Sequence, residues 1–368
     1  MLLAAWRGGE HPSGCNPMKV RSARTLVFSR ENGQIVAFNF LTKSTFSCAH
    51  DLLVFLAFLD DWKSVDELGA FVPTMSAEEL DATIRQLLDV GAITIQGGEL
   101  VEIEDEFRST WGWGLPAALF HFSVQDRDCI SLEESEARQL VRLAECDQPP
   151  LFQTNDWAGG DVQQLPPALD GNELLQLMAR RRTIRSATPT AIPLSQLSEC
   201  LFAGMGITGG TRNCAGTLPL SMTPSGGARN PYEAYVYARF VEGLEVGFYH
   251  YSAFDHTLAR IRTNSKPKPS ELLGGQTWAD EMPCIIILFA LFERTMWKYD
   301  DANAYRVVLI EAGHIGQNIM LAATQRGLSA CPTAALNHAA LKRCVAEPKI
   351  THSPVYALTL ASPGAASS

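Results

Sequence analysis

Two neighbouring residues, Lys298 and Tyr299, carry the side chains best suited to chemistry in this chain. A neutral amine can act as a base, and a phenol beside it can act as a proton relay, a base or an orienting donor. The pair precedes an apolar segment at 307–326 that lacks proline and ends before Gly327, which predicts a buried helix. The pair alone also fits an ordinary surface loop, so its interpretation depends on the rest of the chain.

An arginine-rich run follows a predicted helix over 173–179 and contains Arg181, Arg182, Thr183 and Arg185. Guanidinium groups offer planar forks of donors, which are typical of sites for phosphate or for the carbonyl oxygens of a flavin ring. The helix dipole also favours a solvated basic cluster at a helix C-terminus without any ligand. From the run alone, both interpretations stay open.

A third stretch, Pro224, Ser225, Gly226 and Gly227, has no bulky side chain, so its backbone can approach a flat ligand closely. Many ordinary turns have the same composition. Strands are predicted after it, and the continuous β-branched and aromatic run at 284–292 is typical of a central strand covered on both faces.

Composition excludes several classes of protein. The length of 368 residues indicates two or three domains, and the net charge of −10 argues against nucleic-acid binding. Nine scattered cysteines without a C-x-x-C motif favour reduced thiols, and their spacing predicts no metal site. The apolar start precedes Arg7, which is the wrong order for a signal peptide, so we expect a cytoplasmic protein. Polar residues such as Glu311 and His314 make the helix at 307–326 a core helix rather than a membrane span.

The N-terminal part divides into a disordered tail at 1–17 and a winged-helix-like domain at 18–106. Asn32-Gly33 predicts a hairpin turn, and serines at 64 and 76 predict helix starts. A hairpin of 92–95 with 100–103 would form the wing. The third helix is acidic and would repel phosphate, so DNA binding is the weakest interpretation. Peptide docking, including capture of an extended peptide by a strand edge, and a purely structural role stay open.

Residues 107–170 are predicted as a connecting segment, with a strand at 118–123 and a linker rich in proline and glycine at 148–169. A second domain is expected at 171–368.

Five motifs then follow one another: Arg181-Arg182-Thr183-x-Arg185, Pro224-Ser225-Gly226-Gly227-Ala228, Gly247–Tyr251, Lys298-Tyr299 with Tyr305-Arg306, and Glu311–Asn318. In this order they resemble the SagB-type (McbC-like) dehydrogenases of the nitroreductase superfamily, over about residues 171–362. Three features depart from that pattern. The last strand ends in Ala361-Ser362-Pro363 instead of reaching a glycine, and no lysine or arginine follows Lys349 to bind a phosphate. The region 328–347, with Cys331-Pro332-Thr333, is also atypical.

The resemblance implies an α+β fold, with an antiparallel-rich sheet flanked by helices, in a homodimer that binds FMN at the subunit interface. It implies that the arginine-rich run contacts FMN, that Pro224 to Gly227 bind it with Ser225 and Gly226 beside its ring, and that Lys298 and Tyr299 form a catalytic pair.

The same resemblance implies a function in the maturation of ribosomal peptides. The expected reaction oxidises thiazoline or oxazoline rings in a precursor peptide to thiazole or oxazole, with oxygen as electron acceptor and a cyclodehydratase as a possible partner. One alternative is an NAD(P)H-dependent reductase of dehydroamino acids or of nitro and quinone compounds. Another is a non-catalytic scaffold that docks the precursor.

Overall fold

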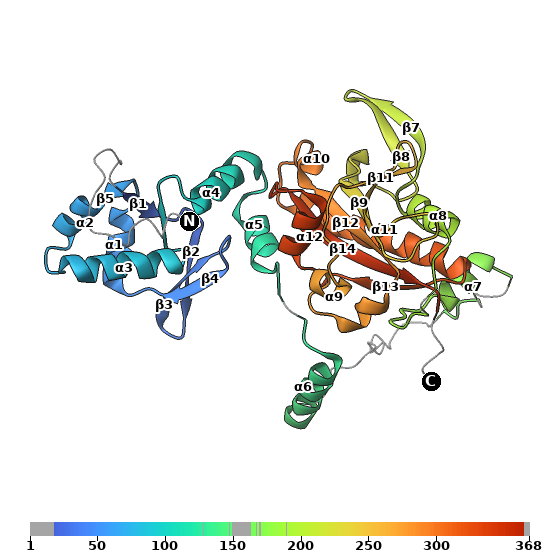
Figure 1. Cartoon of the computed structure of the whole chain (residues 1–368), viewed down its shortest axis with the longest axis horizontal. Coiled ribbons are helices and arrows are strands. Elements are labelled where there is room, and N and C mark those ends of the chain that lie inside the picture. Colours follow the sequence, from blue (N-terminus) through green and yellow to red (C-terminus); the bar gives the residue numbers. More distant parts are fainter. Residues whose placement is uncertain are drawn as a thin grey trace. The chain divides into compact units, whose positions relative to one another are not determined.

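The computed structural model describes residues 18–363, apart from 128, 147, 149–162, 167, 169–170 and 189. The chain forms two compact units that divide between Ser123 and Val124 (Figure 1). The expected tail at 1–17 and most of the expected linker lie outside the described residues.

The first unit combines short strands with helices. Its elements are β1 (Lys19–Ser22), β2 (Leu26–Glu31), β3 (Gln34–Asn39), β4 (Ser44–Ser47), α1 (His50–Phe58), β5 (Lys63–Ser64), α2 (Val65–Phe71), α3 (Ala77–Asp89), β6 (Ile93–Ile95), α4 (Glu99–Thr110) and α5 (Gly114–Ser123). The strands form two antiparallel sheets in the orders β5-β1-β6 and β2-β3-β4.

The predictions for this unit that depend on turn residues and helix N-caps are confirmed. The hairpin of β2 and β3 turns at Asn32-Gly33, and both residues have positive φ. Ser64 and Ser76 each form a capping box with the glutamate three residues later, which satisfies backbone N–H groups at the starts of α2 and α3.

The expected wing is wrong. Residues 100–103 lie in helix α4, and β6 pairs with β1 instead. Acidic residues in the first turn favour a helix start, and Gly98 is its N-cap. The expected strand at 118–123 is also wrong, because this segment is part of α5, where residues 117, 118, 121 and 122 are buried with helical spacing. The three predicted helices are present as α1, α2 and α3, whereas α4 and α5 are additional, and most of the β-structure lies ahead of α1.

A buried ion pair ties α4 to the first strand. Glu104 is fully buried, and its Oε2 accepts a hydrogen bond from Nη2 of Arg21 at 2.8 Å, while Arg21 is only 3% exposed. The other carboxylate oxygen accepts from the backbone N–H of Arg24 at 2.6 Å. One side chain therefore holds the end of β1, the following turn and α4 together.

The second unit is larger. Its elements are α6 (Leu132–Glu145), α7 (Glu173–Arg180), α8 (Leu194–Met205), β7 (Ile207–Asn213), β8 (Gly216–Ser221), η2 (Gly226–Ala228), β9 (Tyr232–Ala238), β10 (Gly247–Ser252), β11 (Thr257–Arg260), α9 (Pro269–Leu272), η3 (Thr277–Glu281), β12 (Cys284–Leu291), α10 (Phe292–Met296), α11 (Asn303–Gln325), β13 (Ser329–Thr333), α12 (His338–Val345) and β14 (His352–Ala361).

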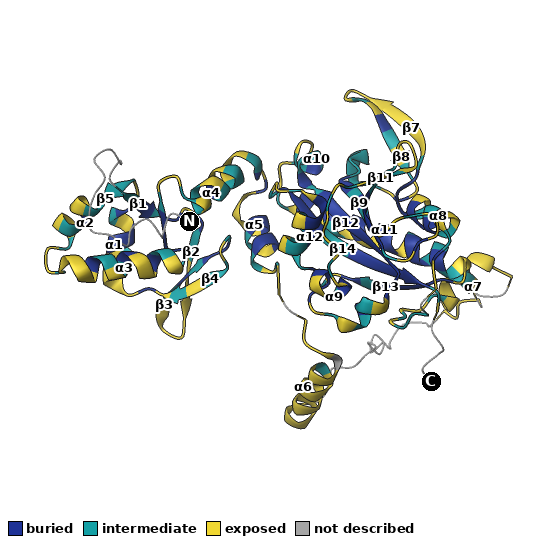
Figure 2. Cartoon of the chain, viewed as in Figure 1, coloured by how far each residue is buried: buried dark blue, intermediate teal, exposed yellow. Residues whose placement is uncertain are grey.

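A six-stranded antiparallel sheet in the order β11-β10-β9-β12-β14-β13 forms the centre of this unit. The predicted central strand at 284–292 is confirmed as β12, and its residues from Cys284 to Ala290 are buried. Figure 2 shows the burial of the sheet and the exposure of hairpin β7–β8.

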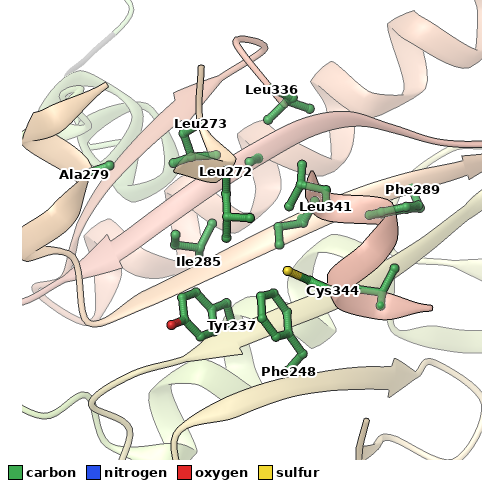
Figure 3. Close-up of a cluster of buried hydrophobic side chains, with 13 residues drawn as sticks. Tyr237, Phe248, Leu272, Leu273, Ala279, Ile285, Phe289, Leu336, Leu341 and Cys344 are labelled. Carbon is green, nitrogen blue, oxygen red and sulfur yellow. The ribbon is translucent and has the colours of Figure 1, made fainter. Parts of the chain in front are cut away.

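Helices cover both faces of the sheet, as alternation along β12 requires. Ile285, Ile287 and Phe289 face a core that includes Leu272 of α9 and Leu341 of α12 (Figure 3). The opposite face carries α8 and α11, and a β-carbon on Gly316 of α11 would lie 2.5 Å from the ring of Tyr356. The predicted α+β fold, a sheet flanked by helices, is confirmed.

Helix α11 confirms the predicted core helix and is longer than expected, at 23 residues. Among the described residues it is the one helix long and apolar enough to cross a membrane. Core helices of soluble proteins often have the same length and composition, so this is weak evidence of a membrane span. Ten of its residues, including Glu311, are buried, and it packs on α8, β13 and β14.

We predict that Glu104→Ala destabilises the first unit by about 3–5 kcal/mol, because Arg21 would stay buried without a partner. Chemical denaturation of the full chain, followed through the first unit's transition, measures the loss. Replacing both partners, as in Arg21→Met with Glu104→Leu, should recover much of it. A loss below about 1 kcal/mol for Glu104→Ala would contradict this account.

Candidate functional site

The backbone of Gly227 lies against the two side chains that the sequence analysis singles out. A β-carbon on Gly227 would lie 2.5 Å from Nζ of Lys298 and 2.6 Å from Oη of Tyr299, so any other residue would displace the pair. The Lys298 amine also lies 5.2 Å from the centroid of the Tyr299 ring, within cation–π range. The third motif and the Lys-Tyr pair, which are 71 positions apart in the sequence, therefore form one site.

Helix α10 positions the pair at the end of the central strand. Phe292 and Thr295 are buried, and the backbone N–H groups of Lys298 and Tyr299 donate to the carbonyl of Thr295 at 3.1 and 2.9 Å. Glu293, in the first turn, accepts from the Thr351 hydroxyl and pairs with His352. Lys298 is exposed in this chain.

The segment from Ser225 to Asn230 has an unusual backbone. Gly227, Ala228 and Asn230 all have positive φ, at 65°, 53° and 45°. An alanine in this region costs about 1–2 kcal/mol, so the surroundings must stabilise the turn. Asn230 does so by donating its N–H to Oγ of Ser225 at 2.8 Å and by accepting from Oγ of Ser221 at 2.9 Å.

Glu311 of α11 lies beneath this segment and is 5% exposed. Its Oε2 accepts the backbone N–H of Gly226 at 3.3 Å, and the Ser225 hydroxyl also bonds to the carboxyl. Burial raises the pKa of Glu311 to about 7, although both of these bonds favour the ionised form and oppose the rise. A carboxyl group in this state can give or take a proton near neutral pH.

A cavity of about 370 Å³ opens beside the same segment. Residues of α8, the β7–β8 hairpin, the Thr223–Asn230 loop, β9, β10, α10 and α11 line it. Its charged and polar wall comprises Arg229, Asn230, Glu233, His250, Arg294 and Glu311.

The arginine-rich run lies elsewhere in the unit. Thr183 forms a β-bridge with Ala330 of β13, and Arg181, at the C-cap of α7, is half-buried. Arg182 and Arg185 are exposed, and the guanidinium of Arg185 lies 5.9 Å from the ring centroid of Trp278. None of the four residues lines the cavity, and among the described residues no hydrogen bond joins them to Ser225, Gly226 or Gly227.

The structure adds residues that sequence reasoning missed. Arg294 donates to the carbonyl of Asn230 at 2.8 Å and pairs with Glu233, whose other carboxylate oxygen lies 2.7 Å from Nε2 of His250. A glutamate within an apolar helix is the one signal that could have identified Glu311. The network around Glu233 has no such signal, because β9, β10 and α10 bring it together only in the fold.

Comparison with known proteins identifies the larger unit. The sequence profile of the nitroreductase family matches residues 178–361, half of the chain. The protein MJ1384 of Methanocaldococcus jannaschii is 32% identical over 171 residues, which cover 46% of this chain and 82% of that protein. The chain belongs to the nitroreductase family. The expected superfamily is therefore confirmed.

Two further relatives of this nitroreductase-family chain are named for peptide processing. The trifolitoxin-processing protein TfxB of Rhizobium leguminosarum bv. trifolii is 36% identical over 114 residues, and the microcin B17-processing protein McbC of Escherichia coli is 32% identical over 112. Both matches cover 28% of this chain, but the chain spans only 30% of TfxB and 40% of McbC. Among solved structures, a chain of the E. coli microcin synthetase McbBCD complex with truncated pro-MccB17 is 17% identical, with a TM-score of 0.49, over 72% of this chain and 92% of that one.

We predict that Glu311 makes the stability of the second unit depend on pH. Because the folded-state pKa is raised, its contribution is fully present below the ordinary value of 4.5 and is lost as pH rises through about 7. The shift corresponds to a loss of roughly 3 kcal/mol at most. Denaturation between pH 5 and 8 should show a falling difference between wild type and Glu311→Gln. A constant difference would contradict the assignment, whatever other groups titrate in this range.

Proposed function

We propose that this protein is an FMN-dependent dehydrogenase of ribosomal peptide maturation that oxidises thiazoline or oxazoline rings in a precursor peptide to thiazole or oxazole. The observation that carries the proposal is the packing of Lys298 and Tyr299 against Gly227 in a chain of the nitroreductase family. The similarity to the peptide-processing proteins TfxB and McbC supports the substrate class.

The residues of the chain fit a flat, anionic cofactor. Gly226 and Gly227 leave backbone without side chains beside the pair, and the exposed Arg182 and Arg185 present cationic donors suited to a phosphate. FMN, when bound, supplies the two-electron acceptor that the oxidation needs.

The chain's own groups handle the remaining proton. Conversion of an azoline to an azole removes two hydrogens, which leave as a hydride and a proton. In the proposed reaction Lys298 accepts the proton as a general base, and Tyr299 orients its amine or relays the proton through its phenol. Glu311 holds the Ser225–Gly226 segment in place through its hydrogen bonds. In its protonated form, the Glu311 carboxyl adds no negative charge to this side of the site.

A homodimer would unite the two parts of the site. Within one chain, no hydrogen bond among the described residues joins the arginine-rich run at the end of α7 to the Ser225–Gly227 segment. Helix α11 exposes Val307 (36%) and Ile310 (55%), apolar side chains that a second copy would cover. A β-carbon on Gly226 would lie 2.7 Å from Val307, so this surface adjoins the candidate site.

The first unit is proposed to dock the precursor peptide. Strands β2 and β4 are the edges of their sheet, so each leaves backbone groups available to an added strand. The acidic start of α3, with Glu78 and Glu79, makes a nucleic acid an unsuitable partner. A cyclodehydratase that makes the azoline is the partner that this reaction requires.

A second candidate function is an NAD(P)H-dependent reductase of dehydroamino acids or of nitro or quinone compounds. The similarity to MJ1384 favours it, because that relative is named as a nitroreductase and 82% of it is covered by the match. Rapid loss of flavin absorbance on adding NAD(P)H without peptide would support reduction. Slow loss, together with oxidation of an azoline peptide, would support the dehydrogenase.

We predict that Lys298→Ala retains FMN and lowers the rate of azoline oxidation by at least about 100-fold, since general bases contribute about 10²–10⁴. Mass spectrometry of an azoline-containing peptide, which loses two hydrogens on oxidation, measures the rate, and flavin absorbance measures the cofactor. Lys266→Ala, at an exposed lysine outside the site, is the control. Oxidation by Lys298→Ala at the wild-type rate would refute the role of the pair, and an inactive, FMN-loaded wild type would refute the reaction.

We further predict that Ile310→Arg gives a single chain of 40.2 kDa in solution, while the wild type has twice that mass. Burying an unpaired charge in an apolar interface is costly, so the variant should also bind FMN at least about tenfold more weakly. Light scattering and FMN titration measure both effects. Val54→Arg, at an exposed apolar residue of the first unit, is the control. A dimeric Ile310→Arg variant with unchanged FMN affinity would exclude this interface.

A further inference from the structure

The cavity beside the Ser225–Gly227 segment contains one positive charge that its wall does not neutralise. Nε of Arg229 is buried and has no hydrogen-bond partner, and this residue makes no ion pair with any described carboxylate. Its guanidinium carbon lies 4.9 Å from the ring centroid of Trp297, a contact that orients the group but gives its N–H no acceptor. A buried donor without an acceptor is costly, so this site favours a ligand that brings one.

Three other ionisable groups of the wall, Arg294, Glu233 and His250, already bind one another. Arg294 uses one nitrogen for the Asn230 carbonyl and another for Glu233, and His250 binds the second oxygen of that carboxylate. Neither Arg294 nor His250 is left to bind a second negative charge on a ligand. The one unpaired guanidinium balances one negative charge, so the site favours a monoanion over a dianion such as a phosphate monoester.

The rest of the wall is apolar and would hold the body of a small ligand. Met205, Ile207 and Ile315 contribute aliphatic surface, and Phe254 lies at an exposed edge, 77% accessible. A volume of about 370 Å³ is within the range of small-molecule sites. Glu311 lines this cavity and also binds Gly226, so an occupant would lie next to the candidate site.

We propose that this cavity binds a carboxylate with an apolar substituent, with the carboxylate on Arg229 and the substituent against Met205 and Ile315. A planar guanidinium binds a carboxylate with strong, charge-assisted hydrogen bonds. The C-terminus of a peptide and a free organic acid both supply this chemistry. This binding site is separate from the proposed oxidation of azolines. A binding measurement without turnover tests the site alone, so a negative result would leave the proposed oxidation unaffected.

Calorimetric titration of the full-length protein, with the flavin it carries when purified, tests the proposal. The probes are acetyl-Gly-Leu and 4-methylpentanoate as free acids, each matched by its uncharged amide. Arg229→Gln removes the charge, and Arg229→Lys keeps the charge but removes the planar fork. Arg212→Gln, at an exposed arginine of β7 that does not line the cavity, is the matched control.

We expect at least one of the two acids to bind at one site per chain and its amide to bind at least about tenfold more weakly. Arg229→Gln should weaken the acid by at least about tenfold, Arg229→Lys by less, and Arg212→Gln not at all. The acid that binds more tightly identifies the source, a peptide terminus or a free acid. Saturable binding of neither acid, equal binding of acid and amide, or wild-type affinity in Arg229→Gln would each overturn the proposal. The comparison of acid with amide on the wild type stands even if a variant fails to fold.

Discussion

The close approach of one backbone segment to two side chains is the constraint on which the candidate site depends. Gly227 has no side chain, and this absence allows Lys298 and Tyr299 to lie against its backbone. The turn around it is strained, with three residues at positive φ, and its hydrogen bonds to Asn230 and Glu311 hold it in that conformation. Helices α10 and α11 therefore position the site through contacts to a loop that has little stability of its own.

Electrostatics divide this region into paired and unpaired groups. Arg294, Glu233 and His250 bind one another. Burial raises the pKa of the Glu311 carboxyl to about 7. Nε of Arg229 is buried and has no hydrogen-bond partner. Unpaired polar groups cost stability, and such costs are concentrated at binding and catalytic sites. Arg229 and Glu311 both line the cavity beside the Ser225–Gly227 segment, and among the described residues only Nε of Arg229 is left buried without a hydrogen-bond partner, because the Glu311 carboxyl binds Gly226.

The nitroreductase fold places these groups around one sheet but does not gather all the residues that the sequence analysis singles out. Thr183 and its neighbours are anchored at β13, an edge strand, while Lys298 follows the central strand β12. The proposed homodimer would account for this separation and would cover the exposed apolar side chains on α11.

The sequence by itself determined the features that arise from short-range patterns. Capping boxes, the Asn32-Gly33 hairpin, the apolar strand at 284–291 and the helix containing Glu311 were all predictable, because each depends on neighbours within a few positions. The ordered motifs also indicated the family. The same local rules failed at α4 and α5, where tertiary contacts override weak patterns, as the buried pair of Glu104 with Arg21 shows.

Only the tertiary structure decided which distant residues meet. The contact of Gly227 with Lys298, the raised pKa of Glu311 and the cavity lined by Arg229 join segments far apart in the chain. Each depends on how strands and helices pack, because burial and distance are properties of the fold and not of a residue's place in the sequence.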